Sequence, residues 1–332
     1  MDSQARQSNF ELLRLVSMLM VMVCHANGYV NETDLVGAAG ATKLAVNQLC
    51  LVNVNIFVLI SGWFGIKPSI KGFGKLLFQI LFLSLLCFCV FKVVGLPASF
   101  KHDLLPYLLF GSGYWFVVSY LILYVLSPVL NAFVDKATKK EFALFLVLFF
   151  ITEFIYGYAL NVGHFEFGFS ALFFIGLYLL ARYVRVYSGK FFQFNRQVDL
   201  IIYLFASCIS MLLLWYGYKL FGMGFHLNHY DSPLAIIAAI YLILFFSKFH
   251  FQSRIINWMA SSAFAIYLIH ENSLVSPYYH IMFDVLRDRV PLEMWYLLLF
   301  IIVLVLGLAF IITDKLRILI WNMLIKPSKQ HV

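Results

Sequence analysis

Three ionisable residues, Glu11, Arg14 and His25, stand in one apolar stretch near the start of the chain. Inside a membrane helix such a side chain costs about 2.5–3.5 kcal/mol on insertion scales, which makes it a candidate for function. Glu11 precedes Arg14 by three residues, and His25 follows Arg14 by eleven, close to three helical turns. The spacing predicts one shared face, with His25 about 16 Å along the axis from Arg14.

These residue types suit acid–base chemistry on a charged substrate. A histidine takes up and releases a proton near neutral pH, and an arginine binds carboxylate or phosphate groups through two parallel hydrogen bonds. The alternative is that Glu11 and Arg14 form an ion pair at the membrane interface and that His25 packs against a polar neighbour. The shared face of all three favours a functional stripe that ends at His25.

A second set of polar residues, Tyr267, His270 and Glu271, ends another apolar stretch. Tyr267 and His270 are neighbours on a helix surface, three residues apart. A histidine close to a carboxylate suits proton transfer. Equally, His270 can serve as a hydrogen-bonding strut between helices.

Further candidates come from two other apolar segments. Ser61 and Gly62 form a small-residue pair that allows close approach of another helix or of a ligand, packing being the commoner reason. Trp115 opens a later helix, where it can line a pocket or anchor the helix at the membrane interface.

The segment from His226 to Asp231 matches a known catalytic motif but is not expected to be catalytic. Its spacing matches the His-x4-Asp motif of soluble-domain glycerolipid acyltransferases, but it is predicted to lie in a short outer loop. A metal site of His226, His229 and Asp231 is little better supported, because its ligands are weakly specified.

The elements that carry these residues are predicted to be membrane helices. Of the 332 residues, 63% are hydrophobic and 12% are charged, and the mean hydropathy is +0.88, whereas soluble domains carry roughly 25% charged residues. The net charge of +8 fits an excess of Lys and Arg on cytoplasmic loops, so nucleic-acid binding is not expected. We expect one membrane domain over residues 1–332.

Apolar segments predict an all-α fold of about ten transmembrane helices. They lie near residues 10–30, 46–65, 76–95, 114–134, 142–160, 168–187, 198–221, 233–249, 258–283 and 293–314. With the N-terminus in the cytoplasm, seventeen of the 24 Lys and Arg residues fall inside, six fall outside, and Arg14 lies in the first helix. The distribution predicts a multi-pass protein with both termini cytoplasmic.

The sequence of the first helix resembles that of the acyltransferase-3 family. Members of this family have an Asn, an acidic residue, Leu-Arg, and a histidine eleven residues after that arginine. Here these are Asn9, Glu11, Arg14 and His25. Further motifs of the family recur in order in Phe57–Phe64, Tyr114–Pro128 and Ala265–His270. The resemblance covers essentially the whole chain and implies the ten helices of the family.

The resemblance implies acyl transfer, most simply of acetyl from cytoplasmic acetyl-CoA to a sugar hydroxyl. The acceptor would be a lipid-linked or exported saccharide of a bacterial surface polysaccharide. The enzyme would lie in the cell membrane, in contact with membrane lipid, and would bind the acceptor there. Since we find no appended soluble domain, a later step would need a separate polysaccharide-biosynthesis protein.

Acyl transfer from a thioester needs a base or an acyl carrier, and donors for the oxyanion. We assign the first role to His25. Arg14 would bind the CoA phosphates or polarise the thioester, with Glu11 orienting it. The remaining candidates bind substrate: Tyr267 and His270 as donors to acceptor or oxyanion, and Ser61 and Trp115 as pocket walls. No metal is required.

Two other classes of membrane protein share these features. A polysaccharide transporter or flippase also needs many helices and buried polar groups, but usually shows repeats and broken helices, which the sequence does not clearly show. A glycan polymerase would be favoured by a long outer loop, and none is predicted.

Overall fold

The computed structural model describes residues 6–28, 37–109, 111–187, 189, 192–221 and 226–325, in which every regular element is helical. The α-helices are α1 (Ser8–Asn27), α2 (Gly37–Cys50), α3 (Asn53–Phe64), α4 (Ile70–Val93), α5 (Leu105–Leu108), α6 (Trp115–Lys136), α7 (Lys139–Thr152), α8 (Ala171–Tyr187), α9 (Arg196–Phe221), α10 (Pro233–Ser247), α11 (Arg254–Ala260), α12 (Ala263–His270), α13 (Ser276–Arg287) and α14 (Leu292–Ile325). Short π or 3-10 turns are η2 (Phe100–Leu104), η3 (Glu153–Ala159), η4 (Glu166–Gly168) and η6 (His226–Asn228). The predicted all-α fold is confirmed.

The number of long apolar helices is lower than the predicted ten. Within the described residues, seven helical segments are long and apolar enough to cross a membrane: Ser8–Asn27, Gly37–Phe64, Ile70–Val93, Trp115–Lys136, Lys139–Ala159, Arg196–Leu220 and Leu292–Leu324. Two predicted spans are too short, since α8 has 17 residues and α10 has 15. At about 1.5 Å per residue, neither reaches the roughly 30 Å of a hydrocarbon core.

The third missing span, residues 258–283, is broken into α11, α12 and α13. The amide oxygen of Asn272 accepts a hydrogen bond from the backbone N–H of Leu274 at 3.2 Å, an alternative to a helical bond. Pro277, which has no N–H to donate, stands in the first turn of α13. The break falls in a polar stretch, His270–His280, which the predicted span bridged by joining the apolar residues before and after it.

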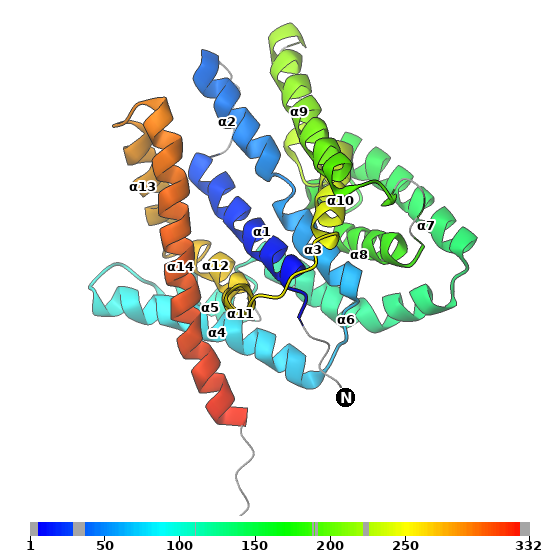
Figure 1. Cartoon of the computed structure of the whole chain (residues 1–332). Coiled ribbons are helices and arrows are strands. Elements are labelled where there is room, and N and C mark those ends of the chain that lie inside the picture. The colour runs from blue at the N-terminus through cyan, green and yellow to red at the C-terminus, as the bar shows by residue number, and fades with distance from the viewer. Residues whose placement is uncertain are drawn as a thin grey trace, which may run out of the picture.

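Helix α1 lies in the middle of the bundle (Figure 1), where it packs against α2, α3 and all of α10 to α14. In its most apolar window 61% of the residues are buried, and in that of α2–α3 72%, whereas the other five candidate spans have 22–33%. The polar stripe of α1 is therefore in the protein interior, and the outer helices face lipid.

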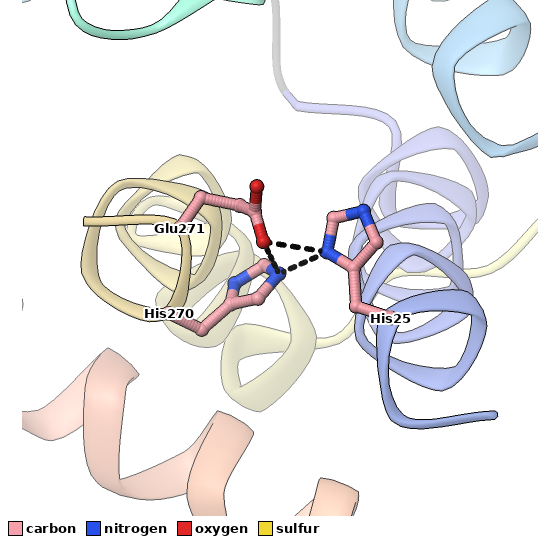
Figure 2. A group of neighbouring side chains, drawn as sticks. All are labelled: His25, His270 and Glu271. Atoms are coloured by element: carbon pink, nitrogen blue, oxygen red, sulfur yellow. Dashed lines mark hydrogen bonds and ion pairs between the residues drawn. The ribbon is translucent and has the colours of Figure 1, made fainter. Parts of the chain in front are cut away.

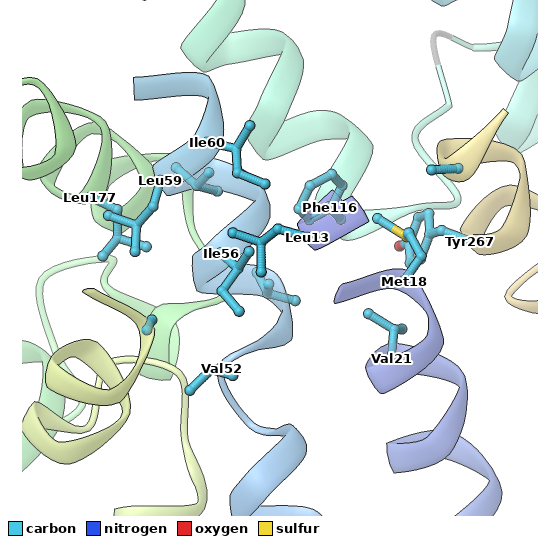
Figure 3. Close-up of a cluster of buried hydrophobic side chains, with 14 of the residues drawn as sticks. Leu13, Met18, Val21, Val52, Ile56, Leu59, Ile60, Phe116, Leu177 and Tyr267 are labelled. Carbon is cyan, nitrogen blue, oxygen red and sulfur yellow. The ribbon is translucent and has the colours of Figure 1, made fainter. Parts of the chain in front are cut away.

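The core around α1 is built from apolar side chains of five helices (Figure 3). Leu13, Met18 and Val21 of α1 lie near Ile56 of α3 and Phe116 of α6, and all of these are buried. Leu177 of α8 and Tyr267 of α12 belong to the same cluster. This packing holds α1 and α12 next to each other.

The beginning of α1 and the end of α14 both point toward the bottom of Figure 1. Residues 1–5 and 326–332 lie outside the described residues. That both termini face the cytoplasm stays a prediction from the Lys and Arg distribution.

Gly62 lets α3 and α8 approach closely. A Cβ atom at this position would lie 2.5 Å from the carbonyl oxygen of Tyr178 and 2.8 Å from Cβ of Ala181. Of the two reasons that the sequence offers for the Ser61–Gly62 pair, close approach of another helix holds at Gly62.

We expect Gly62→Ala to destabilise the protein by about 1–3 kcal/mol, because the backbone of α8 must move to admit a methyl group. Thermal unfolding of the purified protein in detergent measures this as a lower midpoint. The matched control is Gly74→Ala on α4, whose Cβ would lie 3.8 Å from Trp321, an ordinary contact. Equal midpoints for Gly62→Ala and the wild type would contradict the close contact.

Candidate active site

His25, in the last turn of α1, meets the end of α12 (Figure 2). Its Nδ1 atom lies 2.8 Å from Oε1 of Glu271 and 3.0 Å from Nε2 of His270. Nε2 of His270 lies 3.8 Å from the same carboxylate oxygen. Two histidines and one carboxylate thus converge on one point between two helices.

Two consecutive residues at the end of α12 supply both partners. His270 is the last residue of the helix, and Glu271 follows it as the cap, with its backbone N–H still bonded to the carbonyl of Tyr267 at 3.1 Å. The two side chains therefore leave the backbone about 100° apart, as on a helix, and Nδ1 of His25 lies within 3.0 Å of an atom of each.

Buried polar contacts hold this helix end in place. The hydroxyl of Tyr114 donates a hydrogen bond to the carbonyl of Leu268 at 2.6 Å and accepts one from the Asn272 side chain at 3.1 Å. The ring of His270 is fully buried, and its Nδ1 lies 2.6 Å from the carbonyl oxygen of Ile266. Because a carbonyl only accepts, Nδ1 carries the ring proton, and the neutral ring offers the lone pair of Nε2 to His25.

His25 and Glu271 line a cavity of about 260 Å³, named here the His25 cavity. Much of its wall is aromatic, and two of the predicted site residues, Trp115 and Tyr267, contribute to it. The remaining aromatic residues in its lining are Phe57, Phe116, Phe169 and Tyr230. A substrate in this cavity would meet ring faces beside one histidine–carboxylate pair.

Arg14 lines a second cavity of about 230 Å³, named here the Arg14 cavity, together with Arg6 and Ser61. Nη1 of Arg14 lies 2.8 Å from Oε2 of Glu11, which confirms that the two residues share a face of α1. The hydroxyl of Ser61 lies 3.1 Å from that of Tyr120. Two arginines and three hydroxyl groups, those of Ser61, Tyr120 and Ser261, make this a polar pocket that suits an anionic ligand.

Phe57 and Phe116 line both cavities. Their ring centroids are 5.8 Å apart, and the rings are nearly perpendicular. These two side chains form a thin wall between the His25 cavity and the Arg14 cavity. A ligand that reaches from Arg14 to His25 must pass them.

The structure divides the predicted site residues between the two cavities. His25, Trp115 and Tyr267 line one, and Arg14 and Ser61 line the other, so Ser61 and Trp115 do not share a pocket. Fully buried His270 stands beside His25.

Phe57 and Phe116 have no assigned role in the sequence prediction, and Glu271 enters it only as the carboxylate beside His270. For Glu271 the signal was its place directly after His270, but its contact with His25 depends on the packing of α1 against α12.

The His226–Asp231 segment contributes Asn228 and Tyr230 to the His25 cavity. The side chain of His226 lies outside the described residues. Among the side chains that the structure describes, His25, His270 and Glu271 form a group of three possible metal ligands, and neither His229 nor Asp231 belongs to such a group. The His226–Asp231 segment thus forms part of the wall of the His25 cavity.

Comparison with known proteins gives a family match over most of the chain. The model of the acyltransferase-3 family, described as an acyltransferase domain, matches residues 7–314. This range includes α1, α12 and every residue that lines the two cavities except Arg6. No curated protein and no solved structure matches the chain.

Because the Tyr114 hydroxyl joins two parts of the α12 end, we expect Tyr114→Phe to cost about 1–3 kcal/mol of stability. The thermal unfolding midpoint in detergent reports the loss. Tyr216→Phe, an exposed position on α9, is the matched control and should leave the midpoint unchanged. A midpoint for Tyr114→Phe equal to that of the control would show that this hydroxyl does not hold the helix end.

Proposed function

The chain belongs to the acyltransferase-3 family, and from this premise we propose that this multi-pass membrane acyltransferase transfers acetyl from cytoplasmic acetyl-CoA to a sugar hydroxyl. The acceptor is a lipid-linked or exported saccharide of a surface polysaccharide, and the membrane is the cell membrane, the inner one where there are two. Proteins of polysaccharide biosynthesis would supply the acceptor and take over the product.

The observation that carries the proposal is the 2.8 Å contact between Nδ1 of His25 and the Glu271 carboxylate at the wall of the His25 cavity. A carboxylate at one imidazole nitrogen fixes the tautomer and stabilises the ring once it is protonated. With Nδ1 so engaged, Nε2 is the nitrogen left for chemistry, and in Figure 2 it points away from both partners.

Two routes use this nitrogen. As a general base, Nε2 removes the proton of the acceptor hydroxyl while its oxygen attacks the thioester carbonyl; the C–S bond then breaks, and the thiolate leaves and takes up a proton. As an acyl carrier, Nε2 attacks the carbonyl first, releases the thiolate, and passes the acyl group to the hydroxyl afterwards. In both routes Glu271 and His270 are positioning residues, because they act through His25.

The Arg14 cavity is the proposed donor site. Arg14 and Arg6 line it, and Lys75 of α4 lies within electrostatic range of Arg6. Arg317 of α14 is also near Lys75, but its charge is balanced by buried Asp314. This cationic surrounding suits the phosphates of acetyl-CoA, with Glu11 orienting Arg14 through its 2.8 Å ion pair. By charge distribution this end of α1 faces the cytoplasm, where acetyl-CoA is found.

The acceptor site is then the His25 cavity. Tyr267 is the candidate donor to the oxyanion, and Trp115 packs against the sugar. The pantetheine arm of the donor would extend past Phe57 and Phe116, with Ser61 on the donor side of this wall. The acyl group and the hydroxyl would meet at His25.

We expect His25→Ala to abolish acetyl transfer and Glu271→Gln to lower its rate about 10²–10⁴-fold, the range of general-base catalysis. The measurement is acceptor-dependent incorporation of labelled acetyl from acetyl-CoA by purified protein, with lipid-linked saccharides as acceptors. The matched control is His102→Ala, an exposed histidine away from both cavities.

Each variant must first reach the membrane in normal amount. Wild-type transfer rates in His25→Ala would then overturn the role of this histidine. If the wild-type protein transfers no acetyl but moves saccharide across vesicle membranes, it is a transporter.

We expect Arg14→Lys to lose most activity, with kcat/KM for acetyl-CoA at least about tenfold lower, because a lysine cannot form the two parallel bonds of a guanidinium. Initial rates at varied acetyl-CoA measure this, and Arg289→Lys at an exposed position is the control. Near-normal turnover by Arg14→Lys would show that a point charge suffices at this position.

A further inference from the structure

We infer that His25, His270 and Glu271 form a binding site for a divalent transition-metal ion, best matched by Zn²⁺, and that the bound ion inhibits acyl transfer. The inhibition rests on the proposed function, whereas the binding does not. The site uses donor atoms from two helices that are 245 residues apart in sequence.

The spacing of the three donor atoms fits zinc. Nδ1 of His25, Nε2 of His270 and Oε1 of Glu271 are separated by 2.8, 3.0 and 3.8 Å. In a tetrahedral zinc site with bonds of about 2.0–2.1 Å, ligand atoms stand roughly 3.3 Å apart. The three observed separations scatter around this value, so an ion can enter with small side-chain movements.

At the centre of this group, two acceptor atoms face a single possible N–H donor. The Nδ1 proton of His270 is directed to the carbonyl of Ile266, so its Nε2 offers a lone pair. Oε1 of Glu271 offers another, and both face Nδ1 of His25, which carries at most one proton. A cation at the centre, bound by one lone pair from each of the three side chains, would use all of these donors.

The surroundings of His270 also resemble a metal site. A metal-binding histidine usually donates its other ring N–H to a carbonyl or carboxylate, which fixes the tautomer and the ring orientation. The 2.6 Å contact with Ile266 serves this purpose on a fully buried ring. His270 is therefore oriented as a ligand before any ion arrives.

Ligand types and access favour zinc over the common hard cations. Two imidazole nitrogens and one carboxylate suit zinc, whereas Mg²⁺ and Ca²⁺ prefer oxygen ligands. His25 and Glu271 line the His25 cavity. The cavity can admit the ion and a water molecule as fourth ligand.

Occupancy would stop His25 from working as base or acyl carrier. A neutral imidazole holds one proton, so a ring that gives its Nδ1 lone pair to a metal carries that proton on Nε2. Nε2 then has no lone pair with which to take a proton or attack a thioester. Metal and catalysis compete for the same ring.

Titration of EDTA-stripped, tag-free wild-type protein in detergent with ZnCl₂ tests the binding by calorimetry. We expect one Zn²⁺ per chain, and at least tenfold weaker binding in His270→Ala and in Glu271→Gln. Co²⁺ should give the visible bands of a tetrahedral ion in the wild type and in His280→Ala, but not in His270→Ala or Glu271→Gln. His280→Ala is the matched control, since its ring centroid lies 6.3 Å from that of His25 but the residue is outside the donor group.

Zinc should also raise the thermal unfolding midpoint of the wild type and not that of Glu271→Gln, which keeps the shape of the side chain. Acetyl transfer should fall at least tenfold at saturating Zn²⁺ and return on addition of EDTA. Unchanged affinity in Glu271→Gln, or loss of binding in His280→Ala, overturns the assigned ligands. If one Zn²⁺ binds per chain and acetyl transfer is not reduced, the proposed inhibition is wrong. If the protein has no transferase activity, the calorimetric test of zinc binding still applies.

Discussion

The contact of Nδ1 of His25 with Glu271 and His270 is the interaction around which the rest of the structure is arranged. Polar side chains inside a membrane protein need partners, because lipid offers none. Here the partners come from the end of α12, and Tyr114 and Asn272 hold that end with buried hydrogen bonds. The placement of α1 in the middle of the bundle brings the two halves of this contact together.

The same placement gives α1 access to two cavities. Arg14 faces one and His25 the other, and Phe57 and Phe116 stand between them. The 20 residues of α1 thus link a cationic pocket to an aromatic one through the interior of the protein. This arrangement suits the proposed acyl transfer, in which donor and acceptor are bound in separate pockets and the reacting atoms meet at His25.

The break in residues 258–283 replaces one regular span by three short helices, and His270 and Glu271 stand at the end of the middle one. Short helices α11, α12 and α13 are tolerated because they pack against α1, α4 and α14 within the protein. The outer helices, with mostly exposed apolar residues, supply the contact with lipid.

The sequence alone determined the helical class, the membrane setting, the family and the stripe of Glu11, Arg14 and His25, since these follow from composition and from spacing within one helix. It overestimated the number of long spans, because two apolar segments form helices of only 17 and 15 residues and a third is broken in the polar stretch His270–His280. It placed His270 and Glu271 in one set, but their meeting with His25 and the separation of Ser61 from Trp115 were decided by the tertiary structure. Such contacts depend on where a helix ends and on packing between segments distant in sequence, and local periodicity contains neither.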